Sequence, residues 1–146
     1  MKFSVNQKDL QQSLGFCQGV IEKRSTLPIL SNILLEAYNS KLKITATDLD
    51  LIFINEINDV EVIEEGKTTT TSSTLYDIIR KFSSGKKINF NLTTENKIQL
   101  ESEKSVFNLN CMSADEFPLM EENFTENEFV LKSKQFLKLL SKCKFS

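Results

Sequence analysis

Residues 24–32 read Arg-Ser-Thr-Leu-Pro-Ile-Leu-Ser-Asn, and residues 47–50 read Thr-Asp-Leu-Asp. Pro28 restricts the backbone of Leu27 to extended conformations, so a helix is not expected to run through this stretch. The preceding pair Lys23-Arg24 suits the C-terminal end of an amphipathic helix, where the helix dipole favours positive charge. An apolar strand follows. The stretch therefore predicts a helix, an exposed basic loop and a strand in succession.

On either side of this stretch, the chain repeats one pattern three times: a short strand, a polar capping residue and an amphipathic helix. Leu10, Leu75 and Phe136 hold equivalent places in the three helices, 65 and then 61 residues apart. A fixed period of this kind indicates repeated supersecondary units. The apolar residues at helical spacing are Leu10, Leu14, Cys17 and Ile21; Leu75, Ile78, Ile79 and Phe82; and Phe136, Leu139, Leu140 and Cys143.

The segments between these helices predict the rest of the fold. The candidate helix N-caps are Asn6, Ser72 and Ser133. Short apolar and β-branched segments predict strands at 32–38, 42–47, 51–57, 87–92, 97–101 and 106–110. Each of the first two units therefore reads strand, helix and three strands. Two such units, with their helices on one face of an antiparallel sheet, make an α+β domain. We expect it to occupy residues 1–122, with a second, truncated domain beginning at 123–146.

The composition narrows the classes of function. The 146 residues include no histidine, the commonest general base near neutral pH and the commonest metal ligand. Cys17, Cys111 and Cys143 show neither disulfide-framework nor zinc spacing, which favours reduced thiols in the cytoplasm. No apolar run approaches the roughly 18 residues of a membrane helix. These features disfavour a small hydrolase or metal enzyme, and we expect no cofactor and no membrane partner.

The two quoted stretches together resemble the bacterial sliding clamps, the β subunits of the replicative DNA polymerase. That family reads Arg-x-Thr-Leu-Pro-Ile-Leu-x-Asn and then Thr-Asp-Leu-Glu, and here Asp50 replaces the last glutamate. The resemblance extends over the whole chain and implies the DNA-clamp fold, as the first domain plus the start of the second. It implies a non-catalytic processivity factor, in which two subunits close head to tail into a homodimeric ring around duplex DNA. The polymerase and the clamp loader would bind a cleft of the full-length parent that this chain does not contain.

Basic residues on the helices are candidates for sequence-independent DNA contacts. By resemblance, these are Arg24 in the loop after the first helix, Arg80 on the second helix and Lys138 on the third. Lys134, Lys138 and Lys142 also form a single stripe at i, i+4 and i+8. The alternative is an ordinary solvated face, or in the case of Arg24 a cation that only complements a helix dipole. The family often has a basic residue where this chain has Ser73, so that contact is not expected.

The strand at 106–110 supplies the candidate dimer interface. Phe107 and Leu109 lie two residues apart and therefore on one face. The resemblance places an aromatic residue and a leucine here against the partner subunit, with Lys104 as a basic neighbour and Val106 where the family is often basic. An exposed strand edge suits pairing with another chain. The alternative from alternation alone is that both side chains form half of the domain core.

Two further interpretations stay open. Asp48 and Asp50 resemble a metal or acid–base pair, but a turn stabilised by aspartate side chains explains them with fewer assumptions. A stand-alone first domain could also act as an interaction module that caps an intact clamp subunit, or be inert. This second interpretation would apply if the chain lacks the domains needed to close a ring.

Overall fold

The computed structural model describes residues 1–21, 27–93, 95–119 and 130–143. The strands are β1 (Lys2–Asn6), β2 (Asn32–Tyr38), β3 (Lys41–Thr47), β4 (Ile52–Ile57), β5 (Glu61–Glu64), β6 (Gly66–Thr71), β7 (Lys87–Leu92), β8 (Lys97–Ser102) and β9 (Ser105–Met112). The helices are α1 (Gln7–Cys17), α2 (Ser72–Ile79) and α3 (Ser133–Cys143), with short 3₁₀ turns η1 (Pro28–Ser31) and η2 (Ala114–Glu116). The predicted α+β class and the two strand–helix–three-strand units are confirmed.

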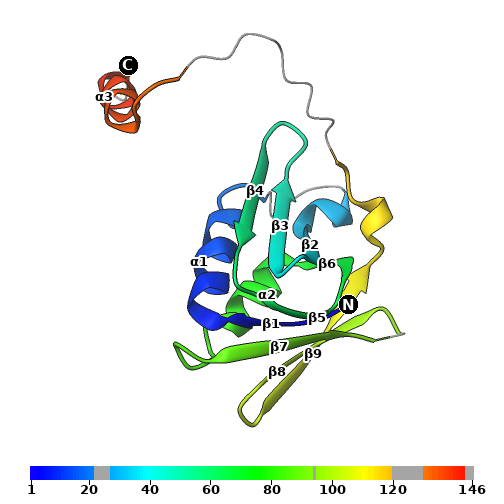
Figure 1. The fold of residues 1–146 in the computed structure, drawn as a ribbon. Coiled ribbons are helices and arrows are strands. Elements are labelled where there is room, and N and C mark those ends of the chain that lie inside the picture. The colour runs from blue at the N-terminus through cyan, green and yellow to red at the C-terminus, as the bar shows by residue number, and fades with distance from the viewer. Residues whose placement is uncertain (22–26, 94, 120–129, 144–146) are drawn as a thin grey trace.

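The strands form one antiparallel sheet in the order β4-β3-β2-β6-β9-β8-β7-β1-β5. Figure 1 shows the sheet curving around α1 and α2, which lie side by side. The sheet has two well-paired halves, β4-β3-β2-β6 and β9-β8-β7-β1-β5, which meet where β6 pairs with β9, through Thr69 with Met112 and Thr70 with Cys111. The first strand of each repeat lies in the other half of the sheet, because β1 pairs with β7 and β6 pairs with β2, so the two repeats are interlocked in one domain.

The main core lies between the helices and the concave face of the sheet. Leu10 and Leu14 of α1 and Leu75 and Ile79 of α2 are fully buried there, as their helical spacing predicts. Beneath them the strands contribute every second side chain, as the pleat requires. The largest sheet residues in this core are Phe3 and Phe90, whose rings stack with centroids 4.7 Å apart and planes inclined by 7°. The stacked pair fixes the register between β1 and β7, because the two residues are cross-strand partners.

The first helix is shorter than predicted. It ends at Cys17 rather than at Lys23-Arg24, and the chain continues in tight turns as far as Ile21. The amide of Gly19 donates to the carbonyl of Phe16, an i to i+3 bond that tightens the backbone after the last helical turn. Val20 and Ile21 then pack against the core from these turns. Ile21 is therefore an apolar contact of the core, but not a helical one.

The predicted caps are correct at one of the two helices where a cap is described. Asn6 is the N-cap of α1, and its side-chain oxygen accepts a hydrogen bond from the amide of Lys8 at 2.9 Å. At α2 the N-cap is Thr71, one residue earlier than predicted, and Ser72 is the first helical residue. The buried Ser72 hydroxyl instead accepts a hydrogen bond from Nε2 of Gln18 at 2.8 Å. Ser72 therefore ties α2 to α1 and does not cap its own helix.

Glutamine side chains join the two helices at both ends. Besides the bond from Gln18, Nε2 of the buried Gln7 donates to the carbonyl of Ile79 at 2.9 Å and to Oε1 of Gln11 at 2.8 Å. Gln7 begins α1 and Ile79 ends α2, so these contacts match the antiparallel arrangement of the helices. A carbonyl in the last turn of a helix lacks an intrahelical partner, and Gln7 supplies one.

The first residue of the chain is part of the folded domain. Met1 is buried, its ammonium group donates to Oε1 of Glu64 at 2.9 Å, and its carbonyl accepts from the amide of Leu92 at 3.0 Å. Gly66 packs so closely that an added Cβ would lie 2.9 Å from Cβ of Met1. The strand β5, which the sequence pattern does not predict, pairs with β1 beside this contact. Met1 therefore fixes the place where the chain crosses from β5 to β6.

A second, smaller apolar cluster covers part of the opposite face of the sheet. Leu34 of β2 packs there with Ala114, Phe117 and Ile29, so the segment after β9 folds back over the sheet. The ion pair between Lys67 and Asp115, 2.7 Å long, lies on the same segment. This cover also hides Leu34's cross-strand partner, Thr45.

Replacing Thr45 with valine is expected to raise the free energy of unfolding by about 1 kcal/mol. Thr45 is 1% exposed, and its Oγ1 is the one buried side-chain oxygen or nitrogen in the described residues without a hydrogen-bond partner. Valine keeps the branched shape without an unsatisfied hydroxyl. The matched control is Thr70→Val, because the equally buried Thr70 hydroxyl donates to the carbonyl of Asn110. Urea denaturation should show a gain for the first variant and a loss for the second; equal changes would contradict the assignment.

Candidate functional surfaces

Arg80 lies on the exposed side of the α2 end, as the sequence predicts. It directly follows the last helical residue, and its guanidinium carbon lies 5.4 Å from the centroid of the Tyr76 ring. A loose contact of 4.0 Å joins it to the carboxylate of Asp77. Both side chains of this ion pair are more than half exposed, so the contact leaves the guanidinium available to a ligand. Its place on the solvent side of the helix layer suits a contact with a phosphate.

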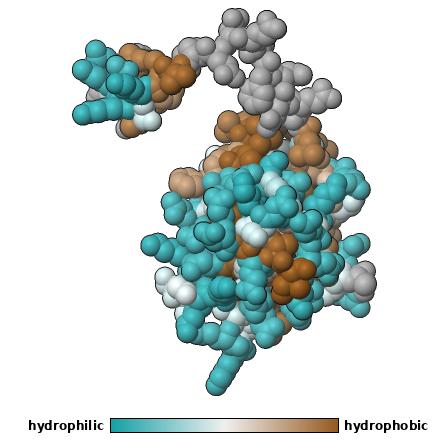
Figure 2. Space-filling view, in the orientation of Figure 1, coloured by the Kyte–Doolittle hydropathy of each residue, from teal (hydrophilic) through white to brown (hydrophobic). Residues whose placement is uncertain are grey.

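The helix α3 separates basic and apolar residues onto two sides. Figure 2 shows hydrophilic side chains along one flank and hydrophobic ones along the other. The predicted stripe Lys134, Lys138 and Lys142 is exposed, and it shows no ion pair among the residues that the structure describes. The apolar residues are also exposed, at 50% for Phe136, 64% for Leu137, 54% for Leu139 and 51% for Leu140. The predicted basic stripe is therefore present on α3, and the apolar residues on the opposite side of this helix are exposed to solvent.

Arg24, the first candidate for DNA contact, lies outside the residues that the structure describes, as does its neighbour Lys23. The described chain resumes at Leu27 and enters the η1 turn with Pro28 as its first residue. Leu27 has an extended backbone, as the proline requires. The basic loop at Lys23 and Arg24 therefore stays a prediction, whereas the extended backbone of Leu27, which follows this loop, is as expected.

Phe107 and Leu109 lie on β9 and point toward the helix side of the sheet. Both are partly buried against the main core, and the Phe107 ring meets Phe82 edge to face with centroids 5.6 Å apart. The alternative that both side chains belong to the domain core is thus partly correct. The same strand also has an open edge at Ser105–Leu109, because these residues pair with β8 alone, whereas Cys111 and Met112 pair with β6 and the Asn110 carbonyl accepts from the Thr70 hydroxyl. The turn between β8 and β9 carries Lys104, which is exposed.

Asp48 and Asp50 form a turn, as the simpler interpretation proposed. Oδ1 of Asp48 accepts hydrogen bonds from the amides of Asp50 at 3.0 Å and Leu51 at 2.7 Å. Leu49 between them has φ of +82°, which few residues other than glycine adopt. The Asp48 carboxylate is therefore used by its own backbone. Across the described residues, no group of three or more cysteine or acidic side chains is placed to hold a metal.

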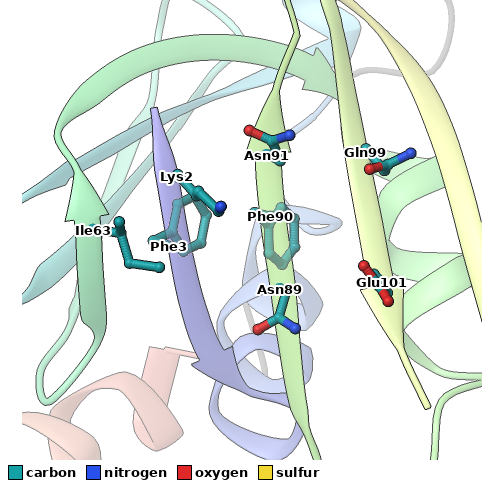
Figure 3. A pocket seen from close by; sticks show the side chains of 8 residues that line it. All are labelled: Lys2, Phe3, Ile63, Asn89, Phe90, Asn91, Gln99 and Glu101. Atoms are coloured by element: carbon teal, nitrogen blue, oxygen red, sulfur yellow. The ribbon is translucent and has the colours of Figure 1, made fainter.

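A polar hollow of about 410 Å³ lies on the outer face of the sheet, across β5, β1, β7 and β8 (Figure 3). Phe3 and Phe90 form its floor, and Ile63 stands at one side. The remaining lining residues are Lys2, Asn89, Asn91, Gln99 and Glu101. The lining therefore offers the hydrogen bonds of three carboxamides and one side chain of each charge, Lys2 and Glu101.

Cys17 is buried and Cys143 is exposed, so we expect the two thiols to differ in reactivity. Burial raises the pKa of the Cys17 thiol to about 12, whereas Cys143 on α3 is exposed. Only the thiolate reacts with maleimides, so at pH 8 we expect rapid labelling of Cys143 and none of Cys17 in the folded chain. Mass spectrometry of labelled peptides provides the check, and equal labelling of both cysteines would contradict the burial of Cys17.

The raised pKa of Cys17 also predicts how the free energy of unfolding depends on pH. Above pH 9 the Cys17 thiol ionises in the unfolded chain but not in the folded chain, so the free energy of unfolding should fall as pH rises.

No helix in the described part of the chain has the length and hydropathy to cross a membrane.

A family model described as the N-terminal domain of the DNA polymerase III beta subunit matches residues 1–121. The beta sliding clamp of Caulobacter vibrioides strain NA1000 is 32% identical over 147 aligned residues, covering all of this chain and 39% of that protein. The beta sliding clamp of Escherichia coli K12 is also 32% identical, over 40% of its length. This chain thus spans about two fifths of the relatives it matches.

Solved structures agree with these relatives. The Caulobacter crescentus pol III beta structure superposes with a TM-score of 0.91 at 32% identity, over 97% of this chain and 38% of that one. The DNA polymerase III subunit beta of Pseudomonas aeruginosa gives a TM-score of 0.91 at 28% identity, also over 97% of this chain and 38% of that one. Sequence, strand order and the helix pair point to the same family. The chain belongs to the bacterial β sliding clamps and corresponds to their N-terminal domain.

Proposed function

We propose that this chain is the first domain of a processivity clamp, part of a ring that encircles duplex DNA and tethers the replicative polymerase. The observation that carries the proposal is the family match over residues 1–121 on a domain whose two helices lie together on one side of the sheet. The domain catalyses no reaction in this proposal. Its contribution is topological, because a closed ring can leave DNA only by sliding off an end or by opening.

The helix side of the domain faces the DNA in this proposal. Arg24, Arg80 and the α3 stripe Lys134, Lys138 and Lys142 contact phosphates. Long cationic side chains with few fixed partners suit this role, since phosphate contacts carry no sequence information and let a protein slide. The exposed Arg80 and the exposed lysine stripe support the assignment. Affinity for DNA should fall steeply with salt, because each contact releases counterions from the duplex.

The β9 strand supplies the contact with the second clamp subunit. The open edge over Ser105–Leu109, the half-buried Phe107 and Leu109, and the exposed Lys104 support this role. The polymerase and the clamp loader are partners of the full-length parent. Residues 123–146 begin its second domain, and the exposed apolar stripe of α3 fits a helix whose covering strands come from elsewhere.

Retention on DNA of different topology tests the ring. The gene product at its native length is loaded onto nicked circular plasmid by its clamp loader, and the plasmid is then linearised. A ring stays on the circle and is lost from the linear molecule, whereas ordinary phosphate binding is retained equally on both. Lys138→Glu should lower retention on the circle at moderate salt, and Lys97→Glu on the outer sheet serves as the control. Equal retention on circular and linear DNA would refute the proposal.

A second candidate function applies if the native polypeptide has the length of this chain, which spans about 40% of its relatives. A stand-alone domain of this kind would cap the free end of an intact clamp subunit through the β9 edge. The mass of the native polypeptide, measured by immunoblot of its own cells, separates the two. A band several-fold heavier than 16.7 kDa supports the clamp, and a band near 16.7 kDa supports the capping module.

A further inference from the structure

The two helices of the domain enclose a groove on their solvent side. Figure 1 shows α1 and α2 side by side, and a hollow of about 450 Å³ lies between them. Its lining combines aromatic, carboxamide and basic side chains, among them Lys8, Gln11, Gln12 and Phe16 on α1 and Tyr76 on α2. Because the main core lies on the other side of these helices, packing against the sheet does not by itself account for the groove.

Phe16 supplies a flat apolar surface at one end of the groove. Its side chain is 57% exposed, and its recorded ring contact is with Phe53, tilted and 5.9 Å away between centroids. Much of the Phe16 ring is therefore open to a planar group of a ligand. A nucleobase is such a group, and it stacks on aromatic side chains whatever its identity, because every base has a π-face.

Tyr76 forms the wall of the groove on α2, and Gly15 of α1 leaves the space in front of it open. An added Cβ at Gly15 would lie 3.7 Å from Oη of Tyr76, so a longer side chain at this position would extend into the groove. The guanidinium carbon of Arg80 lies 5.4 Å from the centroid of the Tyr76 ring, which places a cation beside the groove.

The cations gather at one end of the helix pair. Nε2 of Gln7 at the start of α1 donates to the carbonyl of Ile79 at the end of α2, at 2.9 Å. The next residues, Lys8 and Arg80, therefore lie at the same end. Lys8 is exposed and forms no ion pair in the described part of the chain, and Arg80 has only the 4.0 Å contact with Asp77. This end of the groove suits phosphate groups.

The order of groups along α1 matches the parts of a nucleotide chain. Phe16 follows Lys8 by eight residues, about 12 Å along the helix axis, with Gln11 and Gln12 between them. Oε1 of Gln11 accepts from Gln7, which leaves its amide N–H groups for a ligand. The groove thus runs from cation to carboxamides to aromatic ring. These groups suit a phosphate, the hydrogen-bonding edge of a base and its flat face.

We propose that this groove binds unpaired nucleotides of single-stranded DNA, with a base stacked on Phe16 and phosphates near Lys8 and Arg80. Gln11 and Gln12 bond to the edge of the base. A duplex does not suit the groove, because its bases are stacked on one another and offer no open face to an aromatic side chain. The proposal rests on the proposed clamp function for its ligand and goes beyond it, since the ring contacts duplex phosphates.

Nuclear magnetic resonance titration of the isotope-labelled 146-residue chain measures this binding at low salt. The probes are an oligothymidylate of about ten nucleotides and its duplex with oligoadenylate. The amide signals of Gly15 and Phe16 should shift with the single strand and little with the duplex. Phe16→Ala should weaken single-strand binding by about fivefold or more, and Phe16→Tyr, which keeps an aromatic ring, should retain it. The control Ile63→Ala, at an exposed apolar residue of β5, should bind as the wild type does.

Gly15→Leu tests the groove by a second route. Leucine is a better helix former than glycine, so α1 is retained, while the new side chain fills the space in front of Tyr76. Single-strand affinity should fall as it does in Phe16→Ala. Unchanged signals from the sheet residues show that both variants are folded.

Three results would each overturn the proposal. They are equal affinity of the wild type for the single strand and the duplex, unchanged single-strand affinity in either Phe16→Ala or Gly15→Leu, and shifts confined to the lysines of α3. Retention of the native-length product on circular DNA is scored separately. A retained ring without single-strand binding refutes the groove alone, and single-strand binding by a product that the circle does not retain refutes the ring alone.

Discussion

Replacing Phe90 with alanine is expected to lower the free energy of unfolding by about 3–5 kcal/mol. Phe90 is 1% exposed in the centre of the core and stacks on Phe3 of the neighbouring strand. The variant loses the transfer free energy of the ring and leaves a cavity in a densely packed core. It also loses the stacked pair, which contributes about 0.5–1.5 kcal/mol beyond area burial. Since domains of this size are stable by about 5–15 kcal/mol, the variant should approach the unfolding threshold.

Urea denaturation followed by circular dichroism measures this loss. The matched control is Phe16→Ala, because Phe16 is 57% exposed on α1 and meets one tilted ring, Phe53. Its loss should be below about 1 kcal/mol, as expected for a surface position. Similar losses in the two variants would show that the Phe3–Phe90 stack is not the centre of the core.

Gly66→Val should lower the free energy of unfolding by about 1–3 kcal/mol through overpacking. An added Cβ at this position would lie 2.9 Å from Cβ and 3.4 Å from Cα of Met1, and valine adds two further carbons. Met1 has little room to move, since its ammonium and carbonyl groups are held by Glu64 and the amide of Leu92. The steric strain arises at Gly66, where the chain passes from β5 to β6, so the hydrogen bonds between β1 and β5 should break first.

Thermal unfolding and amide hydrogen exchange together check this prediction. The control is Gly19→Ala, where an added Cβ would meet the Phe16 carbonyl oxygen at 3.5 Å, an ordinary contact. That variant should unfold near the wild-type temperature. Exchange in Gly66→Val should increase mainly in β5 and in the first residues of β1. Uniform acceleration over the whole sheet would instead indicate a global loss of packing.

The regular parts of the fold could be predicted because local pattern and tertiary packing agree there. Leu10 and Leu75 begin apolar stripes of helical period, and both stripes are buried as the period indicates. The helix end at Cys17 could not be predicted, because the charge of Lys23-Arg24 favours a helix end without specifying how far upstream the helix stops. The strand β5 was missed because its four residues begin and end with glutamate, and its partner β1 is far away in sequence.

The candidate sites could be predicted in part. Exposure of Arg80 and of the stripe through Lys138 follows from helical period, since each lies opposite an apolar stripe. The open edge of β9 depends on strand order, which a linear pattern does not give. Phe107 illustrates the difficulty, because it packs on Phe82 and also lies on that edge. Gln7 and Gln18 carried no signal at all, since glutamine is common on exposed helix faces and only the meeting of two helices buries these side chains.

The anchored Met1 has a practical consequence for anyone who fuses a label to this chain. A peptide joined ahead of Met1 converts its ammonium group into a neutral amide and removes the charge that pairs with Glu64. The fused segment must also leave through the space beside Gly66, where the backbone is already in close contact. The loop at Ser84–Gly85 is the better insertion point, because both residues are exposed and an added Cβ at Gly85 would meet no atom within 4 Å. Fluorophores or affinity tags placed there should leave the pairing of β1 with β5 as it is.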